Sequence, residues 1–343
     1  MKSKVQNRST KNDPVLNDIP LACANEHAAV EFMEKQRWGD HPACPECGDT
    51  AVYKMCDRKT GERNKDFRWR CRGCGKVYTV RMGTVFEDSR IPLRHWCFGF
   101  WRASTSKKGV SALEIHRQTG VSYKSALFML HRIRFAMADS CSEPLNGDVE
   151  VDETYVGGKP RYKGLSKRGR GTSKQAVMAL VERGGKVRTR PVADVTSKTL
   201  KGVIREMVHT DARIITDDNS SYKGIGSEYA GGHETACHSV KEYVRGDIHS
   251  NTVESFFAVV KRGLNGIYHA VSRQHLHRYM AEYEFRYNHR SLEDGTRVTE
   301  AIKASEGKRP AAPKAAVYAN FTTPAQLIIV QSNVDLAKLK TVV

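Results

Sequence analysis

The sequence predicts an α+β protein of several domains, and three features of the 343-residue chain support this prediction. Two cysteine pairs lie among short β-like stretches in residues 41–90, a helical segment follows in residues 91–138, and alternating strand-like segments begin at Asp148. Helical and strand-like periodicities occupy different parts of the chain, which favours separate domains. We therefore expect a small cysteine-bearing β-module, a helical segment and an α/β domain with a mixed sheet.

The predicted domain boundaries follow changes in composition and periodicity along the chain. Asn25 is the expected N-cap of a first helix, and Ser197 is the expected N-cap of a later one. The stretch GKRPAAPKAA near the C-terminus has little potential to form a core. The predicted units are a disordered tail over 1–18, the first helix and the cysteine module over 19–90, the helical segment over 91–145, the α/β domain over 146–290 and a C-terminal tail over 291–343.

The chain is strongly basic, because 56 Lys and Arg against 38 Asp and Glu give a net charge of 56 − 38 = +18. Such an excess is typical of proteins that bind polyanions, although a basic, solvated surface gives the same count. The N-terminus lacks the apolar segment of a secretory signal, and no apolar run approaches the roughly 18 residues of a membrane helix. Nine cysteines, an odd number, argue against a disulfide framework. We expect a soluble cytoplasmic protein with no membrane partner.

Four cysteines form two C-x2-C pairs, each followed by glycine and separated by 23 residues. Zinc takes four thiolates in tetrahedral geometry, and two such knuckles on facing turns supply them. The charged stretch DRKTGERNKD between the pairs provides a loop that absorbs the long spacing. The alternative of four unrelated buried thiols is the weaker interpretation, because the two pairs match. We predict one structural zinc ion bound by Cys44, Cys47, Cys71 and Cys74. The remaining cysteines are interpreted as ordinary: Cys23, Cys56, Cys97, Cys141 and Cys237.

Residues 110–137, VSALEIHRQTGVSYKSALFMLHRIRFAM, contain two predicted helices around a turn at Gly120, with Ser122 as the N-cap of the second helix. This pattern fits a helix-turn-helix, whose second helix enters the major groove of DNA by its N-terminal end. It fits a plain αα-hairpin equally well, and the basic charge of the chain favours the DNA interpretation. The residues then expected to contact DNA are Tyr123, Lys124, Ser125, Arg132 and Arg134.

Three acidic residues stand where the predicted topology would bring them together. Asp152 lies in the alternating strand DVEVDETYV, and Asp217 ends the apolar strand ARIIT. Acids at such positions are more often turn formers, but a parallel pairing of the two strands would place Asp152 beside Asp217. The later helix HSNTVESFFAVVKRGL would add Glu254. Converging carboxylates repel one another unless divalent cations are bound, and two Mg²⁺ ions are the usual apparatus for displacement at phosphorus. Asp218 is the less favoured second acid.

The helix that carries Glu254 has an apolar side and a polar side. Lys261 lies seven residues after Glu254, about two turns, and Asn251 lies one turn before it, so all three point nearly the same way. The alternative is that Glu254 and Lys261 are surface charges on an amphipathic helix. A carboxylate binds Mg²⁺ better than a neutral amide does, which favours Glu254 over Asn251 as a ligand.

Three blocks of the sequence, EVDETYVGGK, TDDNSSYKG and HSNTVESFFAVVKRGL, resemble the catalytic blocks of bacterial insertion-sequence transposases with an N-terminal zinc ribbon. These belong to the DDE transposase and integrase superfamily, whose catalytic domain is RNase H-like, and the resemblance spans roughly residues 20–290. It implies that Asp152, Asp217 and Glu254 bind two Mg²⁺ or Mn²⁺ ions and that Lys261, with Arg262 beside it, contacts DNA. Some members of the group use Asn as the third ligand, which makes Asn251 the alternative.

The resemblance also implies an activity. Such an enzyme binds the terminal inverted repeats of its element, cleaves phosphodiester bonds with water and joins the freed 3′-hydroxyl to target DNA, as a homodimer or a larger synaptic assembly on the bacterial nucleoid. Two alternatives remain: a non-catalytic DNA-binding regulator, and an RNase H-type nuclease without joining activity. The basic segment over 158–174 either follows a phosphate backbone or is a solvated loop.

Overall fold

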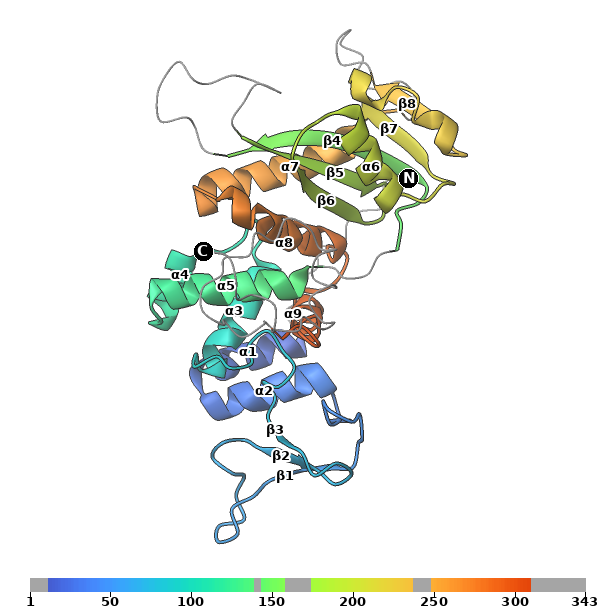
Figure 1. Ribbon diagram of the computed structural model, residues 1–343. Coiled ribbons are helices and arrows are strands. Elements are labelled where there is room, and N and C mark those ends of the chain that lie inside the picture. The colour runs from blue at the N-terminus through green and yellow to red at the C-terminus, as the bar shows by residue number, and fades with distance from the viewer. Residues whose placement is uncertain (1–11, 139–142, 158–173, 237–247, 310–343) are drawn as a thin grey trace, which may run out of the picture.

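The computed structural model describes residues 12–138, 143–157, 174–236 and 248–309 of the chain. Figure 1 shows an elongated molecule with a small sheet at one end, a larger sheet at the other and a group of helices between them. This arrangement confirms an α+β protein of several parts with a mixed sheet. Cys141, Cys237 and all but the last residue of the basic segment over 158–174 lie outside the described residues.

The small sheet has three antiparallel strands in the order β1-β2-β3. It is attached to the helices by one buried acid, Glu34, which pairs with the Arg63 guanidinium and accepts a hydrogen bond from the Trp69 indole at 2.7 Å. Trp38 packs edge-on against Trp69. This anchor fixes a module that has only a small apolar cluster of its own. The strands are β1 (Val52–Lys54), β2 (Trp69–Cys71) and β3 (Val77–Tyr78).

Six helices form most of the largest apolar cluster of the described residues, which includes Trp96, Phe100 and Met129 and to which Phe285 is added from a further helix. Asn25 and Ser122 are the N-caps predicted for two of these helices, and both predictions are confirmed. The helices are α1 (Pro14–Ala24), α2 (Glu26–Trp38), α3 (Leu93–Thr105), α4 (Ala112–Thr119), α5 (Tyr123–Met137) and α9 (Asp294–Lys303).

The predicted terminal tails are wrong where α1 and α9 lie. Helix α1 begins at Pro14, inside the tail predicted over 1–18, and α9 lies inside the tail predicted over 291–343. The Asp13 carboxylate caps α1 and also accepts a hydrogen bond from the Gly295 N–H at 2.8 Å, which joins the two helices. Val298 and Ile302 of α9 are fully buried. Polar residues at the ends of the chain thus serve as tertiary caps, a role that composition does not reveal.

The large sheet has five strands in the order β6-β5-β4-β7-β8. The β4–β7 and β7–β8 pairs are parallel and the other two are antiparallel. Apolar residues of α6 pack on one face, and those of α7 and α8 pack on the other. Thr196, not the predicted Ser197, is the N-cap of α6, since its hydroxyl accepts the Thr199 N–H. The elements are β4 (Asp148–Val156), β5 (Gln175–Glu182), β6 (Val187–Val192), α6 (Ser197–Met207), β7 (Arg213–Asp217), β8 (His233–Ala236), α7 (Asn251–Gly263) and α8 (Leu276–Asn288).

Helix α8 joins the large sheet to the helical group, because it packs against β6 on one side and against α5 on the other (Figure 1). At the α5–α8 contact the buried Glu282 carboxylate pairs with the Arg134 and Arg286 guanidiniums and accepts a hydrogen bond from the Tyr268 hydroxyl at 2.7 Å. Arg134 is only 1% exposed, so the prediction that it contacts a DNA phosphate is wrong. Its guanidinium instead pairs with Glu282 and so helps to hold α5 against α8.

No helix among residues 12–138, 143–157, 174–236 and 248–309 is both long and apolar enough to cross a membrane.

The substitution Glu282→Ala should destabilise the protein by about 3–5 kcal/mol, because it leaves two buried guanidiniums without their carboxylate. Urea unfolding followed by circular dichroism would measure this change. The control is Glu206→Ala, which removes an exposed partner of Arg190 and should cost less than about 1 kcal/mol. Equal unfolding midpoints for the two variants would contradict this account of the α5–α8 contact.

Candidate metal and catalytic sites

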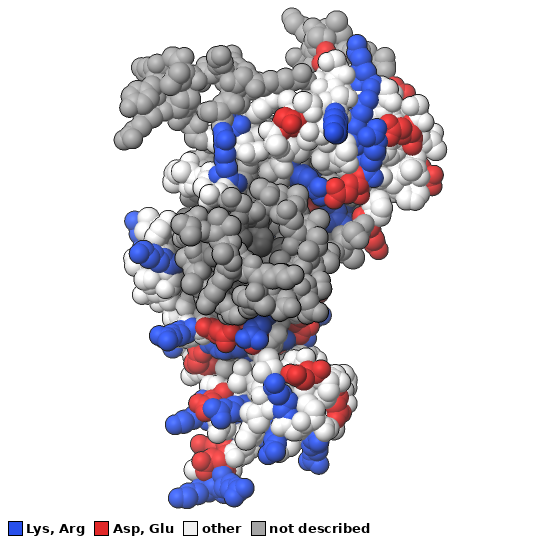
Figure 2. All heavy atoms as spheres, in the orientation of Figure 1, with Lys and Arg blue, Asp and Glu red and all other residues white. Residues whose placement is uncertain are grey.

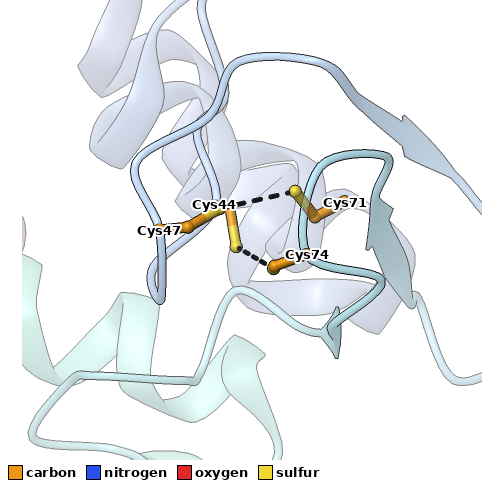
Figure 3. Close-up of side chains that lie close together, drawn as sticks. All are labelled: Cys44, Cys47, Cys71 and Cys74. Atoms are coloured by element: carbon orange, nitrogen blue, oxygen red, sulfur yellow. Dashed lines mark hydrogen bonds between the residues drawn. The ribbon is translucent and has the colours of Figure 1, made fainter.

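The four predicted cysteines gather at one end of the small sheet, as Figure 3 shows. All four sulfur atoms lie within 4.8 Å of one another. The Cys44–Cys74 and Cys47–Cys71 sulfur pairs are 3.7 and 3.6 Å apart. Tetrahedral zinc with Zn–S bonds of about 2.3 Å sets its sulfur ligands about 3.8 Å apart. The spacing therefore fits a structural zinc ion.

Glycine follows each cysteine pair because the backbone at that position is left-handed. Gly48 has φ +74° and Gly75 has φ +72°, in the left-handed region where a side chain would be strained. Each knuckle can thus turn back, so that both of its thiols face the opposite knuckle. Cys56 is exposed and lies outside this group, and burial raises the pKa of the Cys23 thiol to about 11, as expected of an inert thiol.

The thiols of the cluster do not ionise alike. Although burial alone would raise it, the pKa of Cys44 is lowered to about 7 by the backbone N–H groups of Cys47 and Glu46 and by neighbouring thiols. The pKa of Cys47 is raised to about 12 despite a hydrogen bond with the Asp49 backbone, because Cys74 and the other thiols disfavour a second thiolate. A cation is needed for the four sulfurs to be thiolates together, which supports the zinc assignment.

A second group of polar side chains lies on the large sheet. Strands β4 and β7 are parallel neighbours, as predicted, with Val149 opposite Ile214 and Glu150 opposite Ile215. Continuing this register by two residues sets Asp152 beside Asp217. Both side chains then point to the face that α7 covers, because side chains alternate along a strand.

Glu254, on α7, lies close enough to Asp152 for its negative charge to act on that carboxyl group. The pKa of Asp152 is raised to about 7, first by burial and then by the negative charges of Glu153, Asp217 and Glu254. The buried Ser250 hydroxyl donates to Glu254 Oε1 at 3.1 Å and orients this carboxylate. The three acids do not form a group as tight as the cysteines, which are the one such group found among the described residues.

Glu150, two residues before Asp152 on the same face of β4, is the residue that anchors α7. Its carboxylate has no exposed surface. It accepts hydrogen bonds from the Thr252 N–H at 2.8 Å, the Thr252 hydroxyl at 2.8 Å and the Val253 N–H at 3.0 Å. Arg183 on the other side donates to it at 2.7 Å. A carboxylate at a helix N-terminus is stabilised by the free N–H groups and the helix dipole. Glu150 thereby sets where Glu254, on the first turn of α7, lies.

Glu153 plays a similar part on the opposite face of β4. Its two carboxylate oxygens accept hydrogen bonds from the Asn219 amide at 2.7 Å and the Tyr222 hydroxyl at 2.5 Å. Asn219 and Tyr222 follow Asp217 in the block TDDNSSYKG, so Glu153 holds the turn after β7 against β4. Sequence reasoning missed Glu150 and Glu153. The sequence feature that could have identified them is the presence of acidic residues on both faces of a strand whose other residues are largely apolar.

The other predicted site residues are exposed or engaged elsewhere. Asn251, the first residue of α7, and Lys261 and Arg262 in its last turn are exposed, as is Lys124 in the first turn of α5. Their predicted roles stay predictions. Arg132 donates to the Val85 and Glu87 carbonyl oxygens at 2.8 and 2.9 Å, so part of its guanidinium is not available to DNA. Asp218 is exposed, and the charges that most affect the pKa of Asp152 are those of Glu153, Asp217 and Glu254.

Basic side chains are spread over the molecule. On the face drawn in Figure 2, Lys and Arg side chains lie along the whole length from the small sheet to the large one, with acidic side chains among them. A long anion such as nucleic acid suits this distribution better than a compact one.

These features define a protein with two sites: a four-cysteine zinc module, and an acidic site on a mixed sheet. Comparison with known proteins finds matches for both parts of the chain. Residues 24–77 match the model of the transposase zinc-ribbon domain, and residues 144–288 match that of the ISXO2-like transposase domain. A relative described as an uncharacterized protein in transposable element ISH50, from Halobacterium salinarum, is 28% identical over 278 residues, which cover 76% of this chain and 90% of that protein. The chain belongs to the insertion-sequence transposases that carry an N-terminal zinc ribbon.

Protein purified without chelators should contain one zinc ion per chain, because the four thiols suit tetrahedral coordination. Mass spectrometry of the metal content measures this directly. Cys47→Ser should lower the zinc content and unfold the small sheet, since a module with so small a core folds on its metal. The matched control Cys56→Ser should keep the full zinc content. Zinc-free protein with an intact small sheet would contradict the assignment.

The substitution Glu150→Ala should loosen the N-terminal turn of α7, because hydrogen bonds to charged groups contribute about 1.5–3 kcal/mol each. Hydrogen exchange measured by mass spectrometry should then show faster exchange, by tenfold or more, in peptides covering residues 248–256. The control Glu153→Gln weakens a contact on the other face and should speed exchange around residues 219–222 instead. An unchanged α7 peptide in Glu150→Ala would show that this helix is held by its apolar face alone.

Proposed function

We propose that the protein binds the terminal repeats of its element, cleaves phosphodiester bonds at the element ends and joins the freed 3′-hydroxyl to target DNA. The observation that supports this proposal best is the meeting of Asp217 and Glu254 at Asp152, whose pKa their negative charges raise. Carboxylates brought together in this way are suited to hold divalent cations.

We assign two Mg²⁺ or Mn²⁺ ions to the acidic site, with Asp152 and Asp217 sharing one ion and Glu254 completing the second site. When bound, such ions activate a nucleophile and stabilise the leaving oxygen in displacement at phosphorus. Asp152 is half-buried, so its carboxylate is fixed in place, while Glu254 is exposed and accessible to a substrate.

The remaining residues of α7 have separate parts in this proposal. Lys261 holds a phosphate of the DNA. Asn251 orients a water molecule or the scissile phosphate by hydrogen bonding. In cleavage, a water oxygen bonds to phosphorus and the bond from phosphorus to the 3′-oxygen breaks, leaving a 3′-hydroxyl. In joining, that hydroxyl attacks a phosphorus of the target DNA and displaces a 3′-oxygen there.

We assign the large sheet to an RNase H-like catalytic domain and the α4–α5 pair to a helix-turn-helix. The sheet order, with the first and second acids on adjacent parallel strands, supports the first assignment. The second is supported by the left-handed Gly120 between the helices and by exposed Tyr123 and Lys124 at the start of α5. Two element ends must be held together during the reaction, so the working form is a dimer or a larger assembly on DNA.

A regulator without catalytic activity is the second candidate. It would have no use for three acids whose charges converge, or for the buried Glu150 that positions one of them. A nuclease without joining activity shares the acids, and an assay that detects joined products separates it from a transposase.

The substitutions Asp152→Asn and Asp217→Asn should abolish Mg²⁺-dependent cleavage of labelled element ends and leave end binding within about twofold. The loss follows because each removes a charged ligand, and a cation-assisted displacement then loses most of its rate. Gel assays of cleavage and joining, with binding measured in parallel, provide the test. Asp218→Asn is the matched control and should stay active.

Two further variants decide the third ligand. Glu254→Gln should lose cleavage and keep binding, and Asn251→Ala should show the milder defect. The reverse result would move the ligand one helical turn, to Asn251. Cleavage by either Asp152→Asn or Asp217→Asn would overturn the assignment of the acidic site.

A further inference from the structure

The contact between α5 and α8 holds more positive charge than its acid neutralises. We call this region the α5–α8 seam; it comprises His131, Arg134, His275, Arg278, Tyr279, Glu282 and Arg286. Arg134 and Arg286 share the carboxylate of Glu282. Arg278, one turn before Glu282, is half-buried and forms no ion pair or hydrogen bond with any residue in the described part of the chain. Two guanidiniums therefore share the one carboxylate, and that of Arg278 lies close enough to Arg134 for the two positive charges to repel each other.

The partly buried position of Arg278 destabilises the protein in the absence of a ligand. Burial lowers its pKa, and the positive charge of Arg134 lowers it further. A partly buried charge without a partner is unfavourable unless a ligand completes it. An arginine that served only to hold the seam together would be expected to have an acidic partner, as Arg134 and Arg286 do. The seam is thus built for an anion that comes from outside.

Hydrogen-bond donors surround the same place. The His131 and His275 rings lie with their centroids 4.8 Å apart and their planes tilted by 49°, and His131 also meets Tyr279 edge-on at 5.8 Å. The Nδ1 atom of His131 is buried and has no hydrogen-bond partner among the described residues. No side chain of the described residues caps the N-terminus of α8, whose first N–H group, that of Leu276, donates to the Arg273 carbonyl oxygen of the preceding turn. Burial and the neighbouring Arg134 and Arg278 lower the pKa of His131 to about 3, which shows how positive the surroundings are.

We propose that the α5–α8 seam is a binding site for a phosphate of the DNA backbone, with Arg278 as its charged group and the His131 and His275 rings as further donors. This inference rests on the proposed function, because the phosphate belongs to the DNA on which the transposase acts. It adds a contact between the recognition helix and the catalytic domain that neither family domain assigns. A phosphate oxygen accepts hydrogen bonds from guanidinium and imidazole groups alike.

The position of the seam favours a DNA phosphate over a free anion. Tyr123, half exposed at the N-terminal end of α5, acts electrostatically on Tyr279 and so lies near the seam. On the other side, exposed Lys261 and Arg262 end α7, and Tyr268 a few residues later bonds to Glu282. The seam therefore lies between the end of α5 predicted to meet DNA and the helix that carries the acidic site. A duplex that reaches from one to the other passes over it.

The test uses the full-length zinc protein and two short labelled duplexes of unrelated sequence, with binding measured by fluorescence anisotropy over a series of NaCl concentrations. Arg278→Gln should weaken binding to both duplexes equally, about three- to tenfold, and flatten the log–log salt slope by about 0.9, the value for one phosphate contact. Arg278→Lys should largely keep the slope, because it retains the charge. The matched control is Arg290→Gln, which removes the same charge beyond the other end of α8, roughly 18 Å away, and should leave the slope unchanged.

A second measurement separates a ligand site from a structural one. Without DNA, Arg278→Gln should unfold at a higher temperature than the unmodified protein, because it relieves repulsion with Arg134. A lower unfolding temperature would overturn the proposal, since Arg278 would then hold the seam together. An unchanged salt slope would overturn it too. If inorganic phosphate at constant ionic strength stabilises the unmodified protein but not Arg278→Gln while the slope is unchanged, the ligand is a free anion and the DNA assignment is wrong. If the protein binds DNA but does not cleave it, the catalytic proposal is rejected. The salt slope of DNA binding by Arg278→Gln then still decides whether the seam binds a phosphate.

Discussion

The buried carboxylate of Glu150 is the interaction on which the acidic site depends. A charge with no exposed surface is tolerated in a protein only when hydrogen bonds and opposite charge surround it. Here the partners are Arg183 and the first turn of α7, so the cost of burying Glu150 can be offset only if that helix begins at this point. Because Glu150 lies two residues before Asp152, one strand both carries the first acid and fixes the helix that carries the third.

Other buried acids join segments that are far apart in the sequence. Glu34 attaches the small sheet to α2, Asp13 ties α1 to α9, and Glu282 ties α5 to α8. Each satisfies a set of donors that would otherwise be buried without partners. The molecule is elongated, and these polar contacts, together with apolar packing such as that of α8 on the large sheet, join each part to the next. Arg278 departs from this pattern, since no acid completes its charge among the described residues, and for that reason it indicates a ligand.

Much of the architecture could be predicted from local patterns. The cysteine pairs with their glycines indicated the zinc module, and alternation after Asp148 indicated the strands. The order of strands and helices then predicted that Asp152 and Asp217 would be neighbours. The terminal tails were mispredicted because α1 and α9 are stabilised by contacts with distant helices rather than by composition. Arg134 was assigned to DNA because a basic residue on a predicted recognition helix resembles a phosphate contact until its burial is known.

The sequence by itself determined the residue types that chemistry requires: four cysteines at zinc spacing, three acids on two strands and a later helix, and a large excess of basic residues. Their types and spacings are local properties, so they can be read without a fold. Only the tertiary structure decided which charges are buried, shared or left without a partner. Glu150, Glu153 and Glu282 are not distinguishable by sequence from surface acids, and Arg278 is not distinguishable from Arg290. Their difference lies in the groups that other segments bring within a few ångströms, and because charge interactions depend on separation and burial, that difference exists only once the chain has folded.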